Sequence, residues 1–359
     1  MKKITCKLIL VVLLFNLGCS KTICQGLKPF ISNERIKLFT DRTLYISGED
    51  IPFVAYLYLE NNISNNSNSY EAIDNEWNLN RPQKAYSNVI YIELITPDGD
   101  QVIGGKFQCE NSCGKGLITI PKEVLTGIYY IKAYTKFMRN NGPSTYSYTL
   151  LKIVNPLKPD VLVYNSINVI NKDSILLNNS NRNEELLSAT TDKSEYLTRE
   201  PVNVQIKGIN TSRYLIKGLN ISVVPENSFN DQQINSLKSN DSLAEQYYYP
   251  ETNGISLTGI LKDSKSDKPI TNTTINLSIL GDIKDFIAVK TNAKGQFFFK
   301  MPDFIGVRDV FICTEMIDDS KSSILIDNDF CQTKVKLPTP PFQLTEEEKK
   351  IAFKLAQNF

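Results

Sequence analysis

Short runs in which hydrophobic and polar residues alternate recur along most of the chain, and this is the pattern of half-buried β-strands. In Val89–Ile95, for example, Ile90, Ile92 and Leu94 fall on one face of the strand. Thr96–Asp100 follows and contains proline and glycine, so it predicts a turn. Strands are predicted in the same way at Ile51–Leu59, Leu117–Ile120, Ile128–Tyr134, Tyr146–Ile153, Leu257–Leu261, Thr274–Leu280, Phe286–Lys290, Gln296–Lys300 and Val307–Thr314. The chain is therefore predicted to be all-β and built from β-sandwiches.

Two segments rich in Asn and Ser interrupt this pattern. Residues 61–88, which hold the single tryptophan, Trp77, predict a disordered loop inserted into the first sandwich. Residues 157–185 predict a linker with one very short strand at Ile175–Leu177. Polar tracts of this kind bury too little apolar surface to offset the entropy lost on ordering. The first sandwich is therefore predicted over residues 31–156, with the first segment as its insertion and the second segment beginning where it ends.

The stretch Thr40–Tyr56 is echoed by Thr191–Ile206. Both begin with Thr-Asp and a basic residue, and both continue with a tyrosine, a glutamate and then a strand pattern. An echo of this kind indicates that one structural unit occurs more than once. A second sandwich-like unit is therefore predicted over residues 186–250.

A third unit is predicted over residues 254–335, where short strands again alternate with turns. In this unit Ile275, Leu277 and Ile279 share the inward face of one strand, and Asn292–Gly295 is the turn of a hairpin. The pattern indicates a further small sandwich with its own core.

The last segment, residues 336–359, differs from the rest. Thr345 and Glu348 have the spacing of a capping box, which predicts the start of a helix. Hydrophobic residues beyond it fall on one helical face: Ile351, Ala352, Leu355 and Phe359. So short an amphipathic helix must dock on another part of the protein, or else it belongs to a longer protein that was cut short.

The sequence contains no histidine among its 359 residues. This removes the usual general base at neutral pH, the commonest metal ligand and every nucleophile pair that uses histidine. The formal net charge is +1, so no global field recruits nucleic acid or an anionic membrane. No catalytic residue, cofactor site or metal site is predicted, and the chain is interpreted as a non-enzyme.

The N-terminus predicts an export signal over residues 1–25. Early lysines precede the apolar run Leu8–Leu17, which at about ten residues is too short to remain as a membrane-spanning helix. Two processing routes stay open. The tripeptide ending at Cys19 is similar to a lipobox, in which Cys19 is lipidated, whereas ordinary cleavage would fall near Cys24. Either route places the protein in the periplasm or at the outer membrane, and lipidation would allow exposure at the cell surface.

Cysteines beyond this signal are even in number: Cys109, Cys113, Cys313 and Cys331. Since an exported protein meets oxidising conditions, an even number favours disulfides. Three pairings are possible in principle, and proximity in the sequence favours Cys109–Cys113 together with Cys313–Cys331. A zinc site is disfavoured because paired ligands at finger-like spacing are missing.

A cluster of carboxylates has both a functional and a structural interpretation. Asp41, Glu49 and Asp50 could serve acid–base chemistry or bind calcium. The echo at Asp192 and Glu200 favours a repeated structural turn, because a turn explains both copies.

Smaller motifs have the same ambiguity. Asp98-Gly-Asp100 and Asp327-Asn-Asp329 are similar to fragments of calcium loops but have no further spaced oxygen ligands. The three tyrosines Tyr247–Tyr249 could stack on sugars. Adjacent strand residues point to opposite faces, however, so packing between domains is favoured.

These residues resemble an envelope family of Bacteroidetes. The first unit is similar to the second domain of bacterial alpha-macroglobulins, on the marks Thr40-Asp41-Arg42, Tyr45, Gly48-Glu49-Asp50, Tyr91–Gly99 and Gly127–Thr135. The third unit resembles the carboxypeptidase regulatory-like domain, which has a transthyretin-like fold, on the marks Leu257–Leu261, Lys268–Ile270, Thr291–Phe297 and Pro302-Asp303.

The resemblance implies tandem immunoglobulin-like or macroglobulin-like sandwiches, a transthyretin-like sandwich and a short C-terminal helix, in a shortened member of the family. It further implies a non-catalytic scaffold associated with outer-membrane transport or secretion complexes. The partner would be a protein of the outer membrane or periplasm, with no nucleic acid and with membrane contact only through a lipid anchor.

The alternative from a different class is a macroglobulin-like endopeptidase inhibitor. Covalent trapping in that family needs a thioester motif of the Cys-Gly-Glu-Gln type. Neither Cys109-Glu110 nor Cys113-Gly114 fits this motif, so the alternative is an inhibitor without a thioester.

Overall fold

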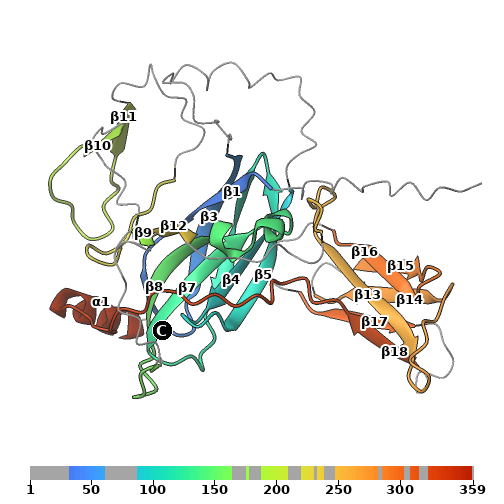
Figure 1. Cartoon of the computed structure of the whole chain (residues 1–359). Helices are drawn as coiled ribbons and strands as arrows, with labels where there is room; N and C mark the ends of the chain where they lie inside the picture. Colours follow the sequence, from blue (N-terminus) through green and yellow to red (C-terminus); the bar gives the residue numbers. More distant parts are fainter. Residues whose placement is uncertain are drawn as a thin grey trace, which may run out of the picture.

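The computed structural model describes residues 32–60, 87–163, 175–177, 187–208, 220–229, 233–237, 247–281, 285–302, 308–314 and 322–357. The expected signal with Cys19, most of the expected insertion with Trp77, and Phe359 lie outside the described residues. Within them the chain is mostly β-sheet, as its alternating pattern predicts, and ends in a short α-helix (Figure 1). No helix in the described ranges is long and apolar enough to cross a membrane.

The first sandwich contains β1 (Glu34–Thr40), β2 (Leu44–Ile46), β3 (Asp50–Leu59), β4 (Val89–Ile95), β5 (Gln101–Glu110), β6 (Cys113–Thr119), β7 (Gly127–Tyr134) and β8 (Ser147–Val154). Two 3-10 turns, η2 (Phe137–Asn141) and η3 (Pro143–Thr145), connect β7 to β8. The strand order is β1-β3-β6-β5-β4-β7-β8, and β2 lies parallel to β8. β5 pairs with β4 along most of its length but with β6 only at its end, so side chains from β1 and β3 meet those from β4 and β7 in one core.

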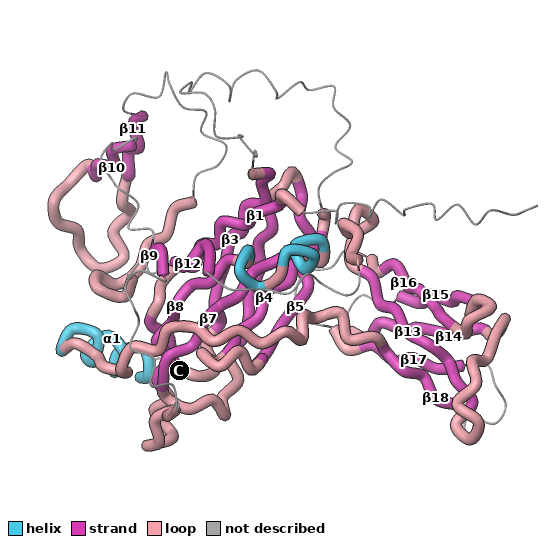
Figure 2. The backbone as a smooth tube through the Cα atoms, viewed as in Figure 1, coloured by secondary structure: helices cyan, strands magenta, loops and turns pink. Residues whose placement is uncertain are grey.

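The central strand β4 is buried on both of its faces. Ile90 points toward β6, because a Cβ on Gly114 would lie 2.5 Å from its Cδ1. Tyr91 and Glu93, which alternation places on the other face, are also buried at 0% and 1% exposure. This second face is covered by the C-terminal part of the chain (Figure 2).

An extended segment, residues 329–345, crosses the outer face of β4, β7 and β8, and we call it the strap (Figure 1). Cys331 N donates to the Tyr134 hydroxyl at 2.8 Å, and the Tyr130 hydroxyl donates to the Pro338 carbonyl at 2.7 Å. The third unit was expected to extend to residue 335, but its last strand ends at Ile326. The residues after it belong to the first sandwich because Cys331 and Leu337 are buried in that core.

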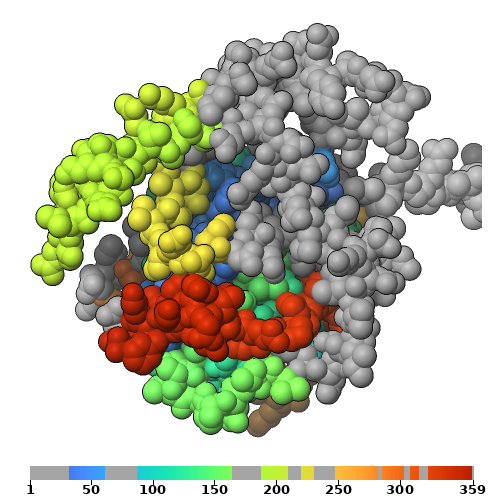
Figure 3. Space-filling model, turned by 90° about the vertical axis from the view of Figure 1, so that its left-hand side faces the viewer, coloured from blue at the N-terminus to red at the C-terminus, as the bar shows by residue number. Residues whose placement is uncertain are grey.

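The strap ends in helix α1 (Glu346–Gln357), whose predicted capping box is confirmed. Glu348 N donates to Thr345 Oγ1 at 3.1 Å, and Thr345 N donates to Glu348 Oε2 at 2.8 Å. The apolar face of α1 docks through Ala352 on Leu44 and Ile46 of β2. Figure 3 shows α1 and the strap lying together along the surface of the first sandwich.

The second unit differs from the expected sandwich within the described residues. Its strands β10 (Leu187–Thr191) and β11 (Val204–Gly208) form a separate two-stranded hairpin. The short strand β9 (Ile175–Leu177), as predicted, and β12 (Gln233–Leu237) instead extend the first sheet beyond β8. Pairing with the edge of the existing sheet thus takes up β12, which the second sandwich would have needed, and also the linker strand β9.

The third unit is a small sandwich of β13 (Ser256–Asp263), β14 (Thr274–Ile279), β15 (Asp285–Lys290), β16 (Gln296–Lys300), β17 (Val310–Thr314) and β18 (Ser322–Ile326). They form two three-stranded sheets, β16-β13-β18 and β15-β14-β17. The predicted inward residues Ile275, Leu277 and Ile279 are confirmed as buried and pack with Phe297 and Phe299.

The alternation rule missed strand β5, and its glycines explain why. Gly104 and Gly105 weaken a strand signal because they have no side chain to pack. In the structure a Cβ on Gly104 would lie 2.9 Å from a ring carbon of Phe330. Glycine is therefore required there by the close passage of the strap, which the sequence of β5 alone does not reveal.

Candidate functional site: a repeated turn and an exposed hairpin

The turn between β1 and β3 is closed by its own side chains. The Tyr45 hydroxyl donates to the Asp41 carboxylate. Glu49 accepts two bonds, one from Ile46 N at 2.7 Å and one from Arg42 Nη2 at 3.0 Å. The Arg42 guanidinium also lies 4.7 Å from the centroid of the Tyr45 ring. Both carboxylates are therefore committed to holding the turn.

The turn between β10 and β11 repeats this hydrogen-bond pattern position by position. The Tyr196 hydroxyl donates to Asp192 at 2.5 Å, and Leu197 N donates to Glu200 Oε2 at 2.8 Å. Lys193 takes the place of the arginine and forms an ion pair with Glu200. The echo in the sequence is therefore a structural repeat.

The backbone repeats as well. The residue before the glutamate has a left-handed conformation in both copies, with φ +91° at Gly48 and φ +65° at Arg199. The third carboxylate of the expected cluster, Asp50, accepts a hydrogen bond from Thr119 Oγ1 at 2.6 Å. Asp41 and Glu49 are thus parts of a repeated turn, whereas Asp50, which has Pro201 at the equivalent position, bonds to β6.

The two copies differ in what covers them. Thr40 lies opposite Phe53 in the first copy, and Thr191 lies opposite Val204 in the second, so the register is the same. Phe53 is 3% exposed, whereas Val204 is 52% exposed. The second copy thus has the same strand register and turn as the first, but no packed layer of the described residues buries it.

One face of the hairpin has the character of a core. Alternation in β10 and β11 places four side chains on that face: Leu187, Ala189, Val204 and Ile206. Their counterparts in the first copy are all buried: Ile36, Leu38, Phe53 and Ala55. In the second copy Ala189 and Val204 are exposed and the other two are half-buried.

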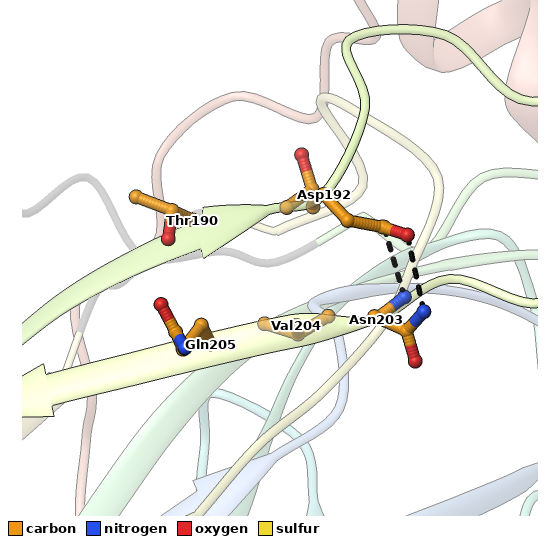
Figure 4. Close-up of a pocket in the computed structure, with 6 residues that line it drawn as sticks. Thr190, Asp192, Asn203, Val204 and Gln205 are labelled. Atoms are coloured by element: carbon orange, nitrogen blue, oxygen red, sulfur yellow. Dashed lines mark hydrogen bonds between the residues drawn. The ribbon is translucent and has the colours of Figure 1, made fainter.

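A shallow hollow of about 280 Å³ lies at the Asp192–Asn203 end of the hairpin and is lined by residues of both faces, among them Gln205 and Val204 (Figure 4). Asn203 N and Nδ2 donate to the Asp192 carboxylate at 3.2 and 3.0 Å. Hydrogen bonds from Tyr196 and then from Asn203 hold the pKa of Asp192 below its usual range. This carboxylate is therefore ionised and engaged, and does not act as a free base.

A matched pair of substitutions tests the repeat. We expect Glu49→Ala to lower the free energy of unfolding by about 2–4 kcal/mol, because it leaves Arg42 and Ile46 N buried without their acceptor. Glu200→Ala removes the equivalent contacts in water and should leave global stability unchanged. Urea unfolding followed by tyrosine fluorescence measures both variants. Equal losses would contradict this account.

The junction between the first sandwich and the third unit is a cluster of charges around Asp329. Lys106 and Lys136 both form ion pairs with its carboxylate, the second at 3.0 Å. Arg139 Nη1 donates to the Asp329 carbonyl at 3.0 Å. Burial alone would raise the pKa of Asp329, but the two lysines outweigh it and hold that pKa below the usual range.

The chain enters the third unit beside the point where it leaves. The Arg139 guanidinium lies 3.9 Å from the ring centroid of Tyr248 and donates to its hydroxyl at 2.8 Å. The Tyr91 hydroxyl donates to Glu251 Oε2 at 2.8 Å. Burial raises the pKa of Glu251 despite this bond and the nearby lysines. Tyr248 therefore has the interdomain role expected for the tyrosine run, while Tyr249 is 81% exposed.

Glu34 is a fully buried carboxylate without a cationic partner among its hydrogen bonds. It accepts from Ser87 N at 2.7 Å, from Ser87 Oγ at 3.1 Å and from Thr135 Oγ1 at 2.5 Å. Burial raises its pKa, and these hydrogen bonds lower it by less. The folded state therefore binds this proton more tightly than the unfolded state does.

The pH dependence that follows has a definite sign. A raised folded pKa gives Glu34 a stabilising contribution at low pH that is lost as the pH rises through the folded pKa. We expect Glu34→Gln to gain stability relative to the wild type as the pH rises from ~4 to ~8. Parallel urea titrations of the two proteins across this range measure the difference. A difference that is independent of pH would contradict the prediction.

The expected disulfides are corrected by the structure, in which all four cysteines are free. Cys109 faces the core, while Cys113 follows a two-residue turn and lies opposite Glu110, on the other face. Cys313 lies in β17 of the third unit, whereas Cys331 lies in the strap, with its Sγ 3.4 Å from the Tyr146 hydroxyl. Proximity in the sequence failed because alternation and the strap separate the partners.

The calcium-like fragments are occupied by protein contacts. Asp100 forms an ion pair with Lys334, and Asp327 accepts from Thr258 Oγ1 at 2.7 Å. In the described ranges no three Asp, Glu or Cys side chains come together in a way that could hold a metal ion. Sequence reasoning missed the charged junction, because its residues come from β5, the loop after β7, and the strap.

No protein-family model and no curated protein matches this chain. Trypsin-activated alpha-2-macroglobulin of Escherichia coli is 13% identical over 76% of this chain, with a TM-score of 0.23. Salmonella alpha-2-macroglobulin reacted with methylamine is 11% identical over 82% of this chain, with a TM-score of 0.23. A tetra-tandem repeat from the extending region of a large adhesion protein is 9% identical over 82% of this chain and 72% of its own, with a TM-score of 0.18. The chain spans only 13% and 15% of the two macroglobulins, and likeness at this level says nothing about function.

Proposed function

We propose that this chain is a non-catalytic interaction module of an exported protein, and that it binds a protein partner at the bacterial envelope. The observation that supports this is the hairpin β10–β11, which repeats the register of the first sandwich but keeps its apolar face exposed. Figure 3 shows the hairpin projecting from the body of the protein.

The free edge of β11 gives this surface a defined binding chemistry. In the first copy, the corresponding edge of β3 is paired with β6. Among the described residues, β11 pairs with β10 alone. An isolated two-stranded hairpin is only marginally stable in water, so an added strand would satisfy its backbone groups and cover its apolar side chains.

The remaining parts of the proposal rest on the sequence. Its lack of histidine and the committed carboxylates of the repeated turn argue for binding rather than catalysis. Export, with lipidation at Cys19 or cleavage near Cys24, would deliver the chain to the periplasm or outer membrane. A role beside transport or secretion complexes follows from the resemblance. No contact among the described residues specifically favours protease inhibition.

Site-specific photo-crosslinking in cells that make the full chain tests the proposal. A photoreactive residue at Val204, on the apolar face, should give a discrete adduct, whereas the same residue at Gln205, on the polar face of the same strand, should not. Ile206→Asp should abolish the adduct. Equal yields at the two positions, or adducts insensitive to Ile206→Asp, would count against the hairpin as the binding surface. A protease-protection assay with the purified chain provides the test of the inhibitor alternative.

A further inference from the structure

The strap covers an aromatic surface that continues across three strands. Tyr91 and Tyr134 stack at 5.2 Å between ring centroids, and Tyr134 and Tyr146 stack at 4.6 Å. Tyr148 follows at 6.5 Å from Tyr146. Phe330 of the strap meets Tyr91 edge-on at 5.6 Å. If the strap dissociated, these tyrosines would form a large exposed aromatic patch on the sheet.

The strap is held mainly by side chains of the sheet, and no described part of it is a β-strand. The Tyr134 and Tyr130 hydroxyls bind its main chain at two points, and Lys152 Nζ donates to the Gln343 carbonyl at 2.9 Å. A main-chain bond from Leu337 N to the Pro97 carbonyl at 2.8 Å adds a further point. Such main-chain contacts hold an extended segment in place, as in grooves that bind peptides, whereas selectivity for sequence must come from its buried side chains.

The chemistry of the strap suits this surface. Residues 337–341 read Leu-Pro-Thr-Pro-Pro, and proline holds a chain extended without internal hydrogen bonds. Leu337 is only 5% exposed and serves as the apolar anchor. At the far end, Glu348 of α1 forms an ion pair with Lys152 at 2.7 Å. Extended proline-rich segments on aromatic-lined grooves lose little entropy on binding.

We propose that the outer face of β4, β7 and β8 is a binding groove for an extended, proline-containing segment followed by an amphipathic helix. Residues 329–357 occupy this groove in cis, and the same residues of a second copy can replace them. The occupant is a second copy of this chain, because its residues 329–357 are identical to the resident strap and helix, whose contacts with this face are seen in the structure. The inference does not depend on the proposed role of β10–β11.

The connection to the third unit favours exchange between copies. Only Asp327 and Asn328 separate the end of β18 from the anchored Asp329. Short hinges of this kind promote domain swapping, and reciprocal exchange between two chains gives a closed dimer. Tethering favours the cis arrangement at low concentration, so the exchanged dimer should grow as the protein concentration rises.

A peptide-binding experiment tests the groove. A fluorescent peptide of residues 329–357 is titrated into full-length wild type, into Leu337→Asp, which weakens only the resident strap, and into Lys336→Asp as the matched exposed control. We expect Leu337→Asp to bind the peptide at least ~10-fold more tightly than the wild type and the control do. Adding Lys152→Ala, which alters the groove, should weaken that binding again. A folded Leu337→Asp variant that does not bind the peptide would overturn the proposal.

Two measurements that do not use Leu337→Asp keep the proposal testable if that variant does not fold. In wild-type hydrogen exchange, the amides of Cys331 and Leu337 should exchange ~100-fold faster than those of β7, whereas equal protection would overturn it. A photoreactive residue at Phe342, which packs on the first core, should crosslink to a differently tagged second copy, with a yield that rises with concentration. Adducts confined to one chain at every concentration would exclude the second copy as the occupant.

Discussion

We expect Lys132→Met to lower the free energy of unfolding by about 3–5 kcal/mol, because it strands a buried carboxylate. Lys132 and Glu93 face each other across β7 and β4 at 2.9 Å, and their side chains are 4% and 1% exposed. With the lysine gone, Glu93 retains the hydroxyl of Tyr134 at 2.6 Å but has lost its counter-charge under the strap.

The double variant Glu93→Leu with Lys132→Met separates charge from shape. It leaves no buried charge, so we expect it to recover most of the lost stability and to come within ~1 kcal/mol of the wild type. Urea unfolding of the wild type, both single variants and the double variant completes the cycle. A double variant as unstable as Lys132→Met alone would show that the pair contributes through packing rather than charge.

We expect Asp329→Asn to release the strap at neutral pH, with a cost of about 2–4 kcal/mol to its docking. The substitution keeps the shape of the buried side chain but removes the counter-charge of Lys106 and Lys136, both of which are half-buried. Increased cleavage of residues 329–345 by a nonspecific protease, with the first sandwich intact, is the measurement. Asp327→Asn, which changes an exposed carboxylate two residues before the strap, is the matched control.

Protonation of the Asp329 carboxylate should also weaken the docking of the strap at low pH. The pKa of Asp329 lies below the usual range, since the two lysines outweigh the effect of burial. Its contribution is therefore present above the unfolded pKa of about 4 and is lost as the pH falls below it. Wild type should then resist protease at pH 7 and lose protection progressively as the pH falls below about 4. Variants at 327 and 329 that behave alike would contradict the role given to Asp329.

The elements that sequence reasoning located best were those governed by local chemistry. Strand β4 has the predicted bounds, and the capping box at Thr345 forms both of its bonds. The repeated turn was detectable because each copy is closed by residues within ten positions of one another. Strand β5 was missed because its two glycines weaken the strand pattern, and the close approach of Phe330 to Gly104 comes from a part of the chain distant in sequence.

The disulfides and the second sandwich were wrong or incomplete for a related reason. Pairing Cys313 with Cys331 assumed that neighbours in the sequence stay in one domain, but the chain leaves the third unit between them. The second unit repeats the hairpin register of the first, yet β12 pairs with β8 of the first sandwich. Neither outcome follows from alternation, which fixes the face of a side chain but not the sheet that receives it.

By itself, the sequence determined the β-rich class, the repeat of the Asp-Tyr-Glu turn, the lack of histidine chemistry and the start of the last helix. These depend on residue type and on contacts along the chain, so they can be read locally. The tertiary structure alone decided that the tail returns across the tyrosines of β4, β7 and β8, that charges from three segments meet at Asp329, and that one copy of the turn is buried while the other is exposed. These features depend on long-range packing. The free energy gained by burial is set by which two surfaces come into contact, and the local order of residues in the sequence does not specify that.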